Sequence, residues 1–70
     1  MTLAEHQARC LALEKECKRL TAACERLETG TRDPNEYGRA VLAMARKALE
    51  WKLAADAYVR AASADEVSRA

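Results

Sequence analysis

The side chains best suited to chemistry are three thiols and one imidazole, all within the first helical pattern of the chain. The cysteines are Cys10, Cys17 and Cys24, and the single histidine, His6, lies four residues before the first of them. Residues four apart share one face of a helix, so His6 and Cys10 have the spacing of two metal ligands. No second histidine or carboxylate completes a ligand set with them. We therefore expect no metal site and no cofactor.

The same residues make a poor catalytic centre. A thiol nucleophile needs an acid–base partner, and His6 is the one histidine available. The cysteine spacing also differs from that of zinc motifs, whose paired cysteines are about two to four residues apart. The sequence contains no phosphate-binding loop and no nucleophile–base pair. We expect that the protein is not an enzyme.

The seven-residue period of the cysteines is typical of helix packing. Leu13, Leu20 and Leu27 interleave with the cysteines and complete the a and d positions of a heptad seam. Seven residues of helix rise by about 10.5 Å, which is too far for a disulfide within the chain. We expect the cysteines to be small buried residues of the seam. A disulfide between two subunits stays open, because it requires facing seams and an oxidising compartment.

Local signals predict both ends of the first helix. Thr2 and Glu5 have the spacing of a capping box, in which each side chain accepts a hydrogen bond from the other residue's backbone N–H. Gly30 can adopt the left-handed conformation that ends many helices. The sequence therefore predicts a helix over about 3–29.

A second helix is predicted to follow almost at once. Asp33 suits the N-cap and Pro34 the first helical position, and the apolar pattern then continues to about residue 62, so we expect a helix over 34–62 and a frayed terminus over 63–70. The short link at residues 30–32 forces neighbouring helices to run antiparallel. The predicted fold is all-α, a two-helix antiparallel hairpin that forms one domain over 1–70.

The second helix has more apolar surface than one partner helix covers. Its seam alternates large and small side chains, namely Tyr37, Met44, Trp51 and Tyr58 at d, and Val41, Ala48, Ala55 and Ala62 at a. A second apolar edge consists of Leu42, Ala45, Leu49 and Leu53. A helix with a single neighbour needs an apolar stripe of only about 100°. We expect a homodimer in which two hairpins form a four-helix bundle, with a docking face for another protein as the alternative.

Charged and aromatic side chains near this edge are candidates for binding a partner protein. Lys52, Asp56 and Arg60 form an i, i+4 series, which is either a solvent-exposed ladder or a charged strip that sets register at an interface. The candidate partner surface comprises Tyr37, Arg39, Arg46, Lys52, Asp56 and Arg60. The expected core and dimer seam comprises Cys10, Leu13, Cys17, Leu20, Cys24, Leu27, Met44, Trp51, Leu42, Leu49 and Leu53.

The composition restricts the class of protein. The 70 residues are 50% hydrophobic and 33% charged, with a formal net charge of +1. This composition is typical of a helical bundle, and its charge balance does not indicate a nucleic-acid partner. We expect a cytoplasmic protein without a membrane segment, because the N-terminus lacks the apolar stretch of a signal peptide and the longest apolar run is Ala40–Ala45.

In size and organisation the chain resembles the small helical-hairpin proteins that phages encode to inhibit host machinery, of the anti-quorum-sensing and anti-CRISPR types. The resemblance lies in the Cys/Leu seam, the turn over 30–36 and the aromatic/Ala seam, and it covers the whole chain. It implies a small inhibitor or adaptor that binds a host regulatory protein through a dimeric hairpin. A structural coiled-coil assembly subunit is the alternative, and a nucleic-acid-binding accessory protein is a less favoured one.

Overall fold

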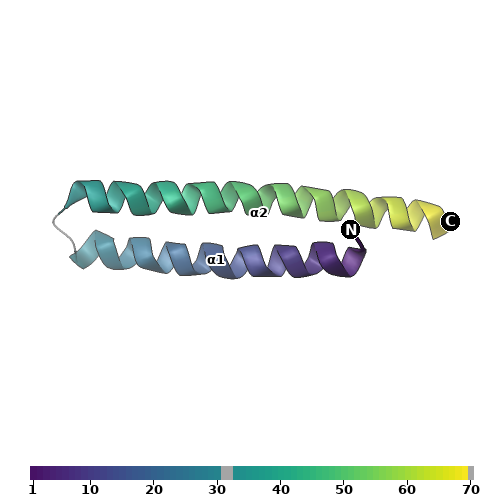
Figure 1. The fold of residues 1–70 in the computed structure, drawn as a ribbon, viewed down its shortest axis with the longest axis horizontal. Coiled ribbons are helices and arrows are strands. Elements are labelled where there is room, and N and C mark those ends of the chain that lie inside the picture. Colours follow the sequence, from purple (N-terminus) through teal and green to yellow (C-terminus); the bar gives the residue numbers. More distant parts are fainter. Residues whose placement is uncertain (31–32, 70) are drawn as a thin grey trace.

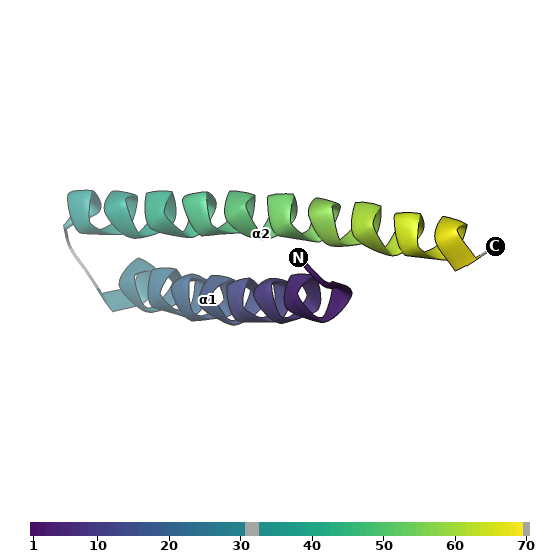
Figure 2. The ribbon, with the colours of Figure 1, turned by 45° about the vertical axis from the view of Figure 1, so that its right-hand side comes forward.

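Two long α-helices make up the fold. The computed structural model describes residues 1–30 and 33–69, with α1 spanning Leu3–Gly30 and α2 spanning Pro34–Arg69. The helices lie side by side and run antiparallel, and the end of α2 extends past the N-terminus of α1 (Figure 1). A second view shows the same arrangement (Figure 2). The predicted all-α hairpin is therefore confirmed over the described residues.

The molecule is a rod. Its dimensions are 57 × 15 × 14 Å, and its radius of gyration is 16.3 Å. A compact domain of this length has a radius of gyration of about 11 Å. Neither helix is therefore enclosed by other parts of the described chain, and each has only the other helix as a neighbour.

The capping box predicted for α1 is present. The Thr2 backbone N–H donates to Glu5 Oε1 at 3.3 Å, and the Glu5 N–H donates to Thr2 Oγ1 at 3.1 Å. These bonds pair backbone donors that have no partner within the helix. They also lower the pKa of Glu5 below its ordinary value of 4.5, because the carboxylate accepts a hydrogen bond from the Thr2 backbone.

The predicted start of α2 is also confirmed. Asp33 precedes the helix, and its Oδ1 accepts a hydrogen bond of 2.9 Å from the Asn35 N–H. The Asp33 carbonyl accepts a further bond of 3.3 Å from the Tyr37 N–H. Pro34 is the first helical residue, where its missing N–H costs nothing.

Two helix ends differ from the predictions. Gly30 is the last residue of α1 and does not have a positive φ, so the expected left-handed cap is not formed there. The remainder of the predicted link, residues 31–32, lies outside the described residues. α2 does not fray after residue 62 but continues to Arg69, because no glycine or proline occurs between residues 62 and 69 and an ion pair of 3.2 Å joins Asp65 and Arg69 in its last turns.

The core between the helices is small. The buried side chains are Leu13, Cys24 and Ala54, which are 9%, 6% and 7% exposed. All the seam residues predicted for the first helix are buried or half-buried, namely Cys10, Leu13, Cys17, Leu20, Cys24 and Leu27. Leu3 and His6, which extend the same heptad spacing toward the N-terminus, are also half-buried. The small Cys24 and Ala54 side chains allow the two backbones to approach.

The contact face of α2 departs from the predicted seam in its middle. Ala48 is exposed and Trp51 is 40% exposed, whereas Lys47, Ala54 and Ala61 are half-buried or buried. Ala40 and Lys47, and likewise Ala54 and Ala61, each precede a predicted a position by one residue and are all half-buried or buried, so the face of α2 in contact with α1 includes these preceding positions. Trp51 therefore lies at the edge of the seam and not at its centre.

Apolar contact holds the two helices together with little help from charges. In residues 1–30 and 33–69, each of the four ion pairs within 4.0 Å joins two residues of the same helix, and none connects α1 with α2. A weak hydrogen bond of 3.4 Å crosses between the helices, from the Thr21 hydroxyl to the Met44 sulfur. Over the described residues, neither helix has an apolar stretch long enough to cross a membrane.

Candidate protein-binding surfaces

An apolar stripe runs along α2 on the side that faces away from α1. We define this apolar stripe as Leu42, Ala45, Leu49 and Leu53, the second edge predicted from the sequence. Its leucines are 50%, 58% and 59% exposed, and Ala45 is also exposed. Each of these leucines is at least half exposed in the hairpin, although Leu53 also borders a hollow beside the N-terminus of α1, and burial of each would be favourable by about 1.5 kcal/mol or more.

A groove lies between the helices on one side of the hairpin. We call it the interhelix groove; its volume is about 440 Å³, and its lining residues are Glu14, Cys17, Lys18, Thr21, Ala22, Glu25, Ala48 and Trp51. The small side chains of Ala22 and Ala48 leave space beside the Trp51 ring. Tryptophan is among the residue types most enriched at energetically dominant interface positions, so this partly exposed ring makes the groove a candidate binding surface.

The α1 residues of this groove were not identified from the sequence. The polar face of α1 carries Glu14, Lys18 and Glu25, a pattern that is typical of a solvated surface. Ala22 is the one apolar residue that this face contributes to the groove. Only the pairing of the helices places it opposite Ala48 and Trp51.

A smaller hollow of about 230 Å³ lies near the N-terminus of α1. It is lined by Met1, His6, Arg9, Glu50, Leu53, Ala54 and Ala57. His6 thus faces residues of α2 as well as lying one turn before Cys10. Within the part of the chain that the structure describes, no three His, Cys, Asp or Glu side chains gather into a metal-binding group.

The predicted partner-binding residues occupy different parts of the surface. Arg39, Arg46, Lys52, Asp56 and Arg60 are all exposed, whereas Tyr37 is half-buried against α1. The expected i, i+4 ladder is not formed, since none of the ion pairs among the described residues includes Lys52, Asp56 or Arg60. These charges are therefore available to a partner. By helical position, Arg39, Arg46, Asp56 and Arg60 continue the line of the apolar stripe.

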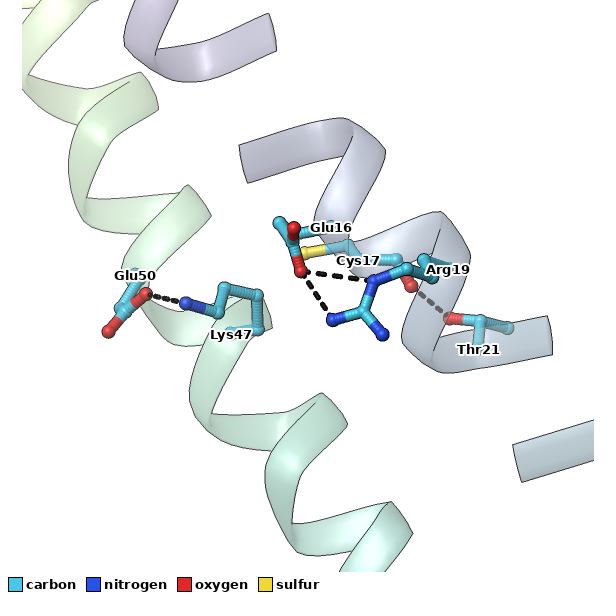
Figure 3. Close-up of polar contacts among 6 residues, drawn as sticks. All are labelled: Glu16, Cys17, Arg19, Thr21, Lys47 and Glu50. Atoms are coloured by element: carbon cyan, nitrogen blue, oxygen red, sulfur yellow. Dashed lines mark hydrogen bonds and ion pairs between the residues drawn. The ribbon is translucent and has the colours of Figure 1, made fainter. Parts of the chain in front are cut away.

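A group of charged side chains covers the side of the hairpin opposite the groove. Arg19 donates to Glu16 at 2.7 Å, and Lys47 lies 2.8 Å from Glu50 (Figure 3). Hydrogen bonding lowers the pKa of Glu16 through Arg19 and that of Glu50 through Lys47, and the Glu50 bond raises the pKa of Lys47. The sequence analysis missed both pairs, although their i, i+3 spacing is a known signal. This side is self-paired and offers little unsatisfied charge.

The comparisons with known proteins return nothing. The chain matches no protein-family model, no curated protein and no solved structure. The class that the fold defines is an antiparallel αα-hairpin, and a fold of this simplicity is compatible with many functions. The candidate functional surfaces of the hairpin are therefore its two exposed apolar features, the stripe and the interhelix groove.

Proposed function

We propose that this protein is a non-enzymatic protein-binding module, an adaptor or inhibitor that acts as a homodimer of hairpins. The observation that supports this most strongly is the apolar stripe, whose three leucines are between 50% and 59% exposed on a helix that already packs against α1. Exposed apolar patches with polar surroundings are typical of protein–protein interfaces.

The area of the chain supports dimerisation. The hairpin exposes 5493 Å². A compact protein of its 7.8 kDa mass exposes about 4,400 Å², roughly 1,100 Å² less. A standard interface buries about 800 Å² on each partner. The excess area of one hairpin is therefore sufficient for a stable dimer, and the stripe is the surface that we assign to it.

The interhelix groove is the surface that we assign to a different protein. It lies at the side of the seam, so a second hairpin seated on the stripe leaves it accessible. The apolar surface beside Trp51 can accept an apolar side chain of the partner protein. Glu14, Lys18 and Glu25, which also line the groove, can contact polar groups around that side chain. An apolar residue on a helix of the partner protein fits this description.

A binding experiment with two alanine sites tests this assignment. Ala22 lines the groove and Ala12 lies on the outer surface of α1; both are exposed and helical. The tagged wild-type protein is expected to retain one or more specific proteins from a lysate of the source cells, identified by mass spectrometry. Ala22→Glu should reduce that retention at least about tenfold, because a charge would occupy the apolar floor. Ala12→Glu should leave it unchanged.

The groove assignment is contradicted if both variants retain the same proteins equally. Circular dichroism of each variant confirms that the hairpin is folded, so that a loss of binding is not a loss of structure. Trp51→Ala provides a second test, and we expect the same loss of the retained proteins.

One observation favours the alternative of a structural assembly subunit. The part of α2 near its C-terminus exposes Val59 and Val67 at 60% and 76%, which adds apolar surface beyond the stripe. In an assembly subunit this surface would be used for further self-association. Oligomers larger than a dimer would then appear as the protein concentration rises.

A further inference from the structure

The interhelix groove contains one carboxylate that has no ion pair within the described hairpin. Three charged residues line the groove, namely Glu14, Lys18 and Glu25. Glu14 and Lys18 pair with each other at 3.4 Å, whereas none of the ion pairs among the described residues includes Glu25. The lining of the groove therefore carries one net negative charge, and that charge is not compensated at Glu25.

The local sequence explains why Glu25 lacks a cation. Side chains that are neighbours on a helix surface are three or four residues apart. At these spacings from Glu25 the chain has no lysine or arginine, but Thr21, Ala22, Glu28 and Thr29. Glu25 is also exposed, so a positively charged group of another molecule can reach it.

Trp51 and Glu25 mark two levels of the same groove. The hydrogen bond of 3.4 Å between Thr21 and Met44 places these two residues side by side in the antiparallel pair. Trp51 is seven residues beyond Met44, away from the link, and Glu25 is four residues beyond Thr21, toward it. Their backbones are thus about 16 Å apart along the rod, at 1.5 Å per residue. Side chains lean toward the N-terminus of their own helix, so in antiparallel helices these two converge.

We propose that the groove receives a helix of the partner protein on which an apolar residue and an arginine are seven positions apart. The apolar residue lies beside Trp51, and the arginine pairs with Glu25. Seven residues of helix rise by about 10.5 Å, which is shorter than the backbone separation of about 16 Å by a distance that the converging side chains span. Anchors at this spacing are usual where a helix binds in a groove. The proposal rests on the groove function proposed above and specifies its ligand.

Arginine has the chemistry that this end of the groove requires. Its guanidinium donates two parallel hydrogen bonds to a carboxylate, and its aliphatic stem can lie along the alanine surface beside Ala22. Lysine offers a point charge without that fork of donors. An acidic residue would bring a like charge to Glu25, which is unfavourable at an interface.

Two synthetic peptides test the proposal. Both are capped, alanine-rich helical peptides of about 20 residues, long enough to be helical in water. Each carries a leucine and, seven positions away, either arginine or citrulline, which has the shape of arginine without its charge. Trp51 is the one tryptophan of the chain, so binding in the groove is measured as a blue shift of its fluorescence. The arginine peptide should bind at least about threefold more tightly at low salt, and high salt should remove the difference.

Two glutamate variants locate the contact. Glu25→Gln should abolish the preference for the arginine peptide, because it removes the carboxylate and keeps the shape of the side chain. Glu28→Gln is the matched control, since Glu28 is exposed on the same helix but does not line the groove. It removes the same charge and should leave the preference unchanged. Circular dichroism of both variants checks that the hairpin is folded.

Each outcome has one interpretation. A preference for arginine that is lost in Glu25→Gln and kept in Glu28→Gln supports the proposal. Equal affinity for the two peptides, a preference that survives Glu25→Gln or disappears in both variants, or no binding of either peptide up to millimolar concentration overturns it. The groove function itself is judged by the proteins whose retention depends on Ala22, as described above. Such proteins, found together with equal peptide affinities, would remove the arginine contact and leave the groove function standing.

Discussion

Small side chains determine how closely the two helices approach. Cys24 and Ala54 are among the most buried residues, and the other thiols, Cys10 and Cys17, are half-buried. A buried thiol acts as a small apolar group unless a base or a metal activates it. A larger residue at these positions would strain the packing by about 1–3 kcal/mol. At this scale the cysteines are therefore packing residues of the hairpin.

The N-cap of α1 gives a prediction for a single residue. Thr2→Ala removes the hydroxyl that accepts from the Glu5 N–H at 3.1 Å. We expect the free energy of unfolding to fall by about 1 kcal/mol. This corresponds to a decrease of roughly 4–8 °C in the thermal midpoint for a domain of this size, measured by circular dichroism at fixed protein concentration.

A second threonine of α1 is the control for this change. The Thr29 hydroxyl donates to helix carbonyls at 3.3 and 3.4 Å and, within the part of the chain that the structure describes, caps no backbone donor. Thr29→Ala should not lower the midpoint, because alanine has the higher helix propensity. Equal losses in the two variants would contradict the capping role of Thr2.

At the scale of the helices, the sequence was informative wherever the signal is local. The caps at Thr2 and Asp33 were predicted and are confirmed, since capping depends on residues within one turn. The edge position of Trp51 was not predicted, because the orientation of the contact face of α2 depends on how two long helices pair. The interhelix groove was missed for the same reason, as Ala22 becomes significant only opposite Trp51.

The helix-terminal and side-chain bonds of the glutamates predict how stability depends on pH. The pKa values of Glu5, Glu16 and Glu50 are lower than 4.5 in the folded state. The stabilisation that these carboxylates give is complete above their ordinary pKa and is lost as the pH falls through the folded pKa. The thermal midpoint should therefore fall between about pH 5 and pH 3. The raised pKa of Lys47 has the opposite sense, so its contribution is lost only as the pH rises beyond 10.5.

Replacement of the three glutamates by glutamine isolates this effect. The triple variant has glutamine at positions 5, 16 and 50. Its thermal midpoint should decrease by fewer degrees between pH 5 and pH 3 than the midpoint of the wild type does. All three side chains are exposed to solvent, so the difference is expected to be small but measurable. Identical acid profiles for the two proteins would contradict the assignment of these bonds.

At the scale of the whole molecule, the hairpin is a rod with few enclosed residues. Over the described chain only Leu13, Cys24 and Ala54 count as buried. A chain of this size buries a small share of its surface, and association with a second copy is one common remedy. The dimer that we propose places α2 between α1 and the partner's α2, and it leaves the interhelix groove accessible to another protein.

Light scattering coupled to gel filtration, at micromolar concentration, tests the homodimer most directly. Leu49→Glu replaces a leucine of the stripe that is 58% exposed, and Leu11→Glu, at a leucine of α1 that is 53% exposed, is the matched control. The account predicts about twice the 7.8 kDa chain mass for the wild type and for Leu11→Glu, and a monomer for Leu49→Glu. A folded wild-type monomer, or a dimer that Leu49→Glu leaves intact, would contradict it.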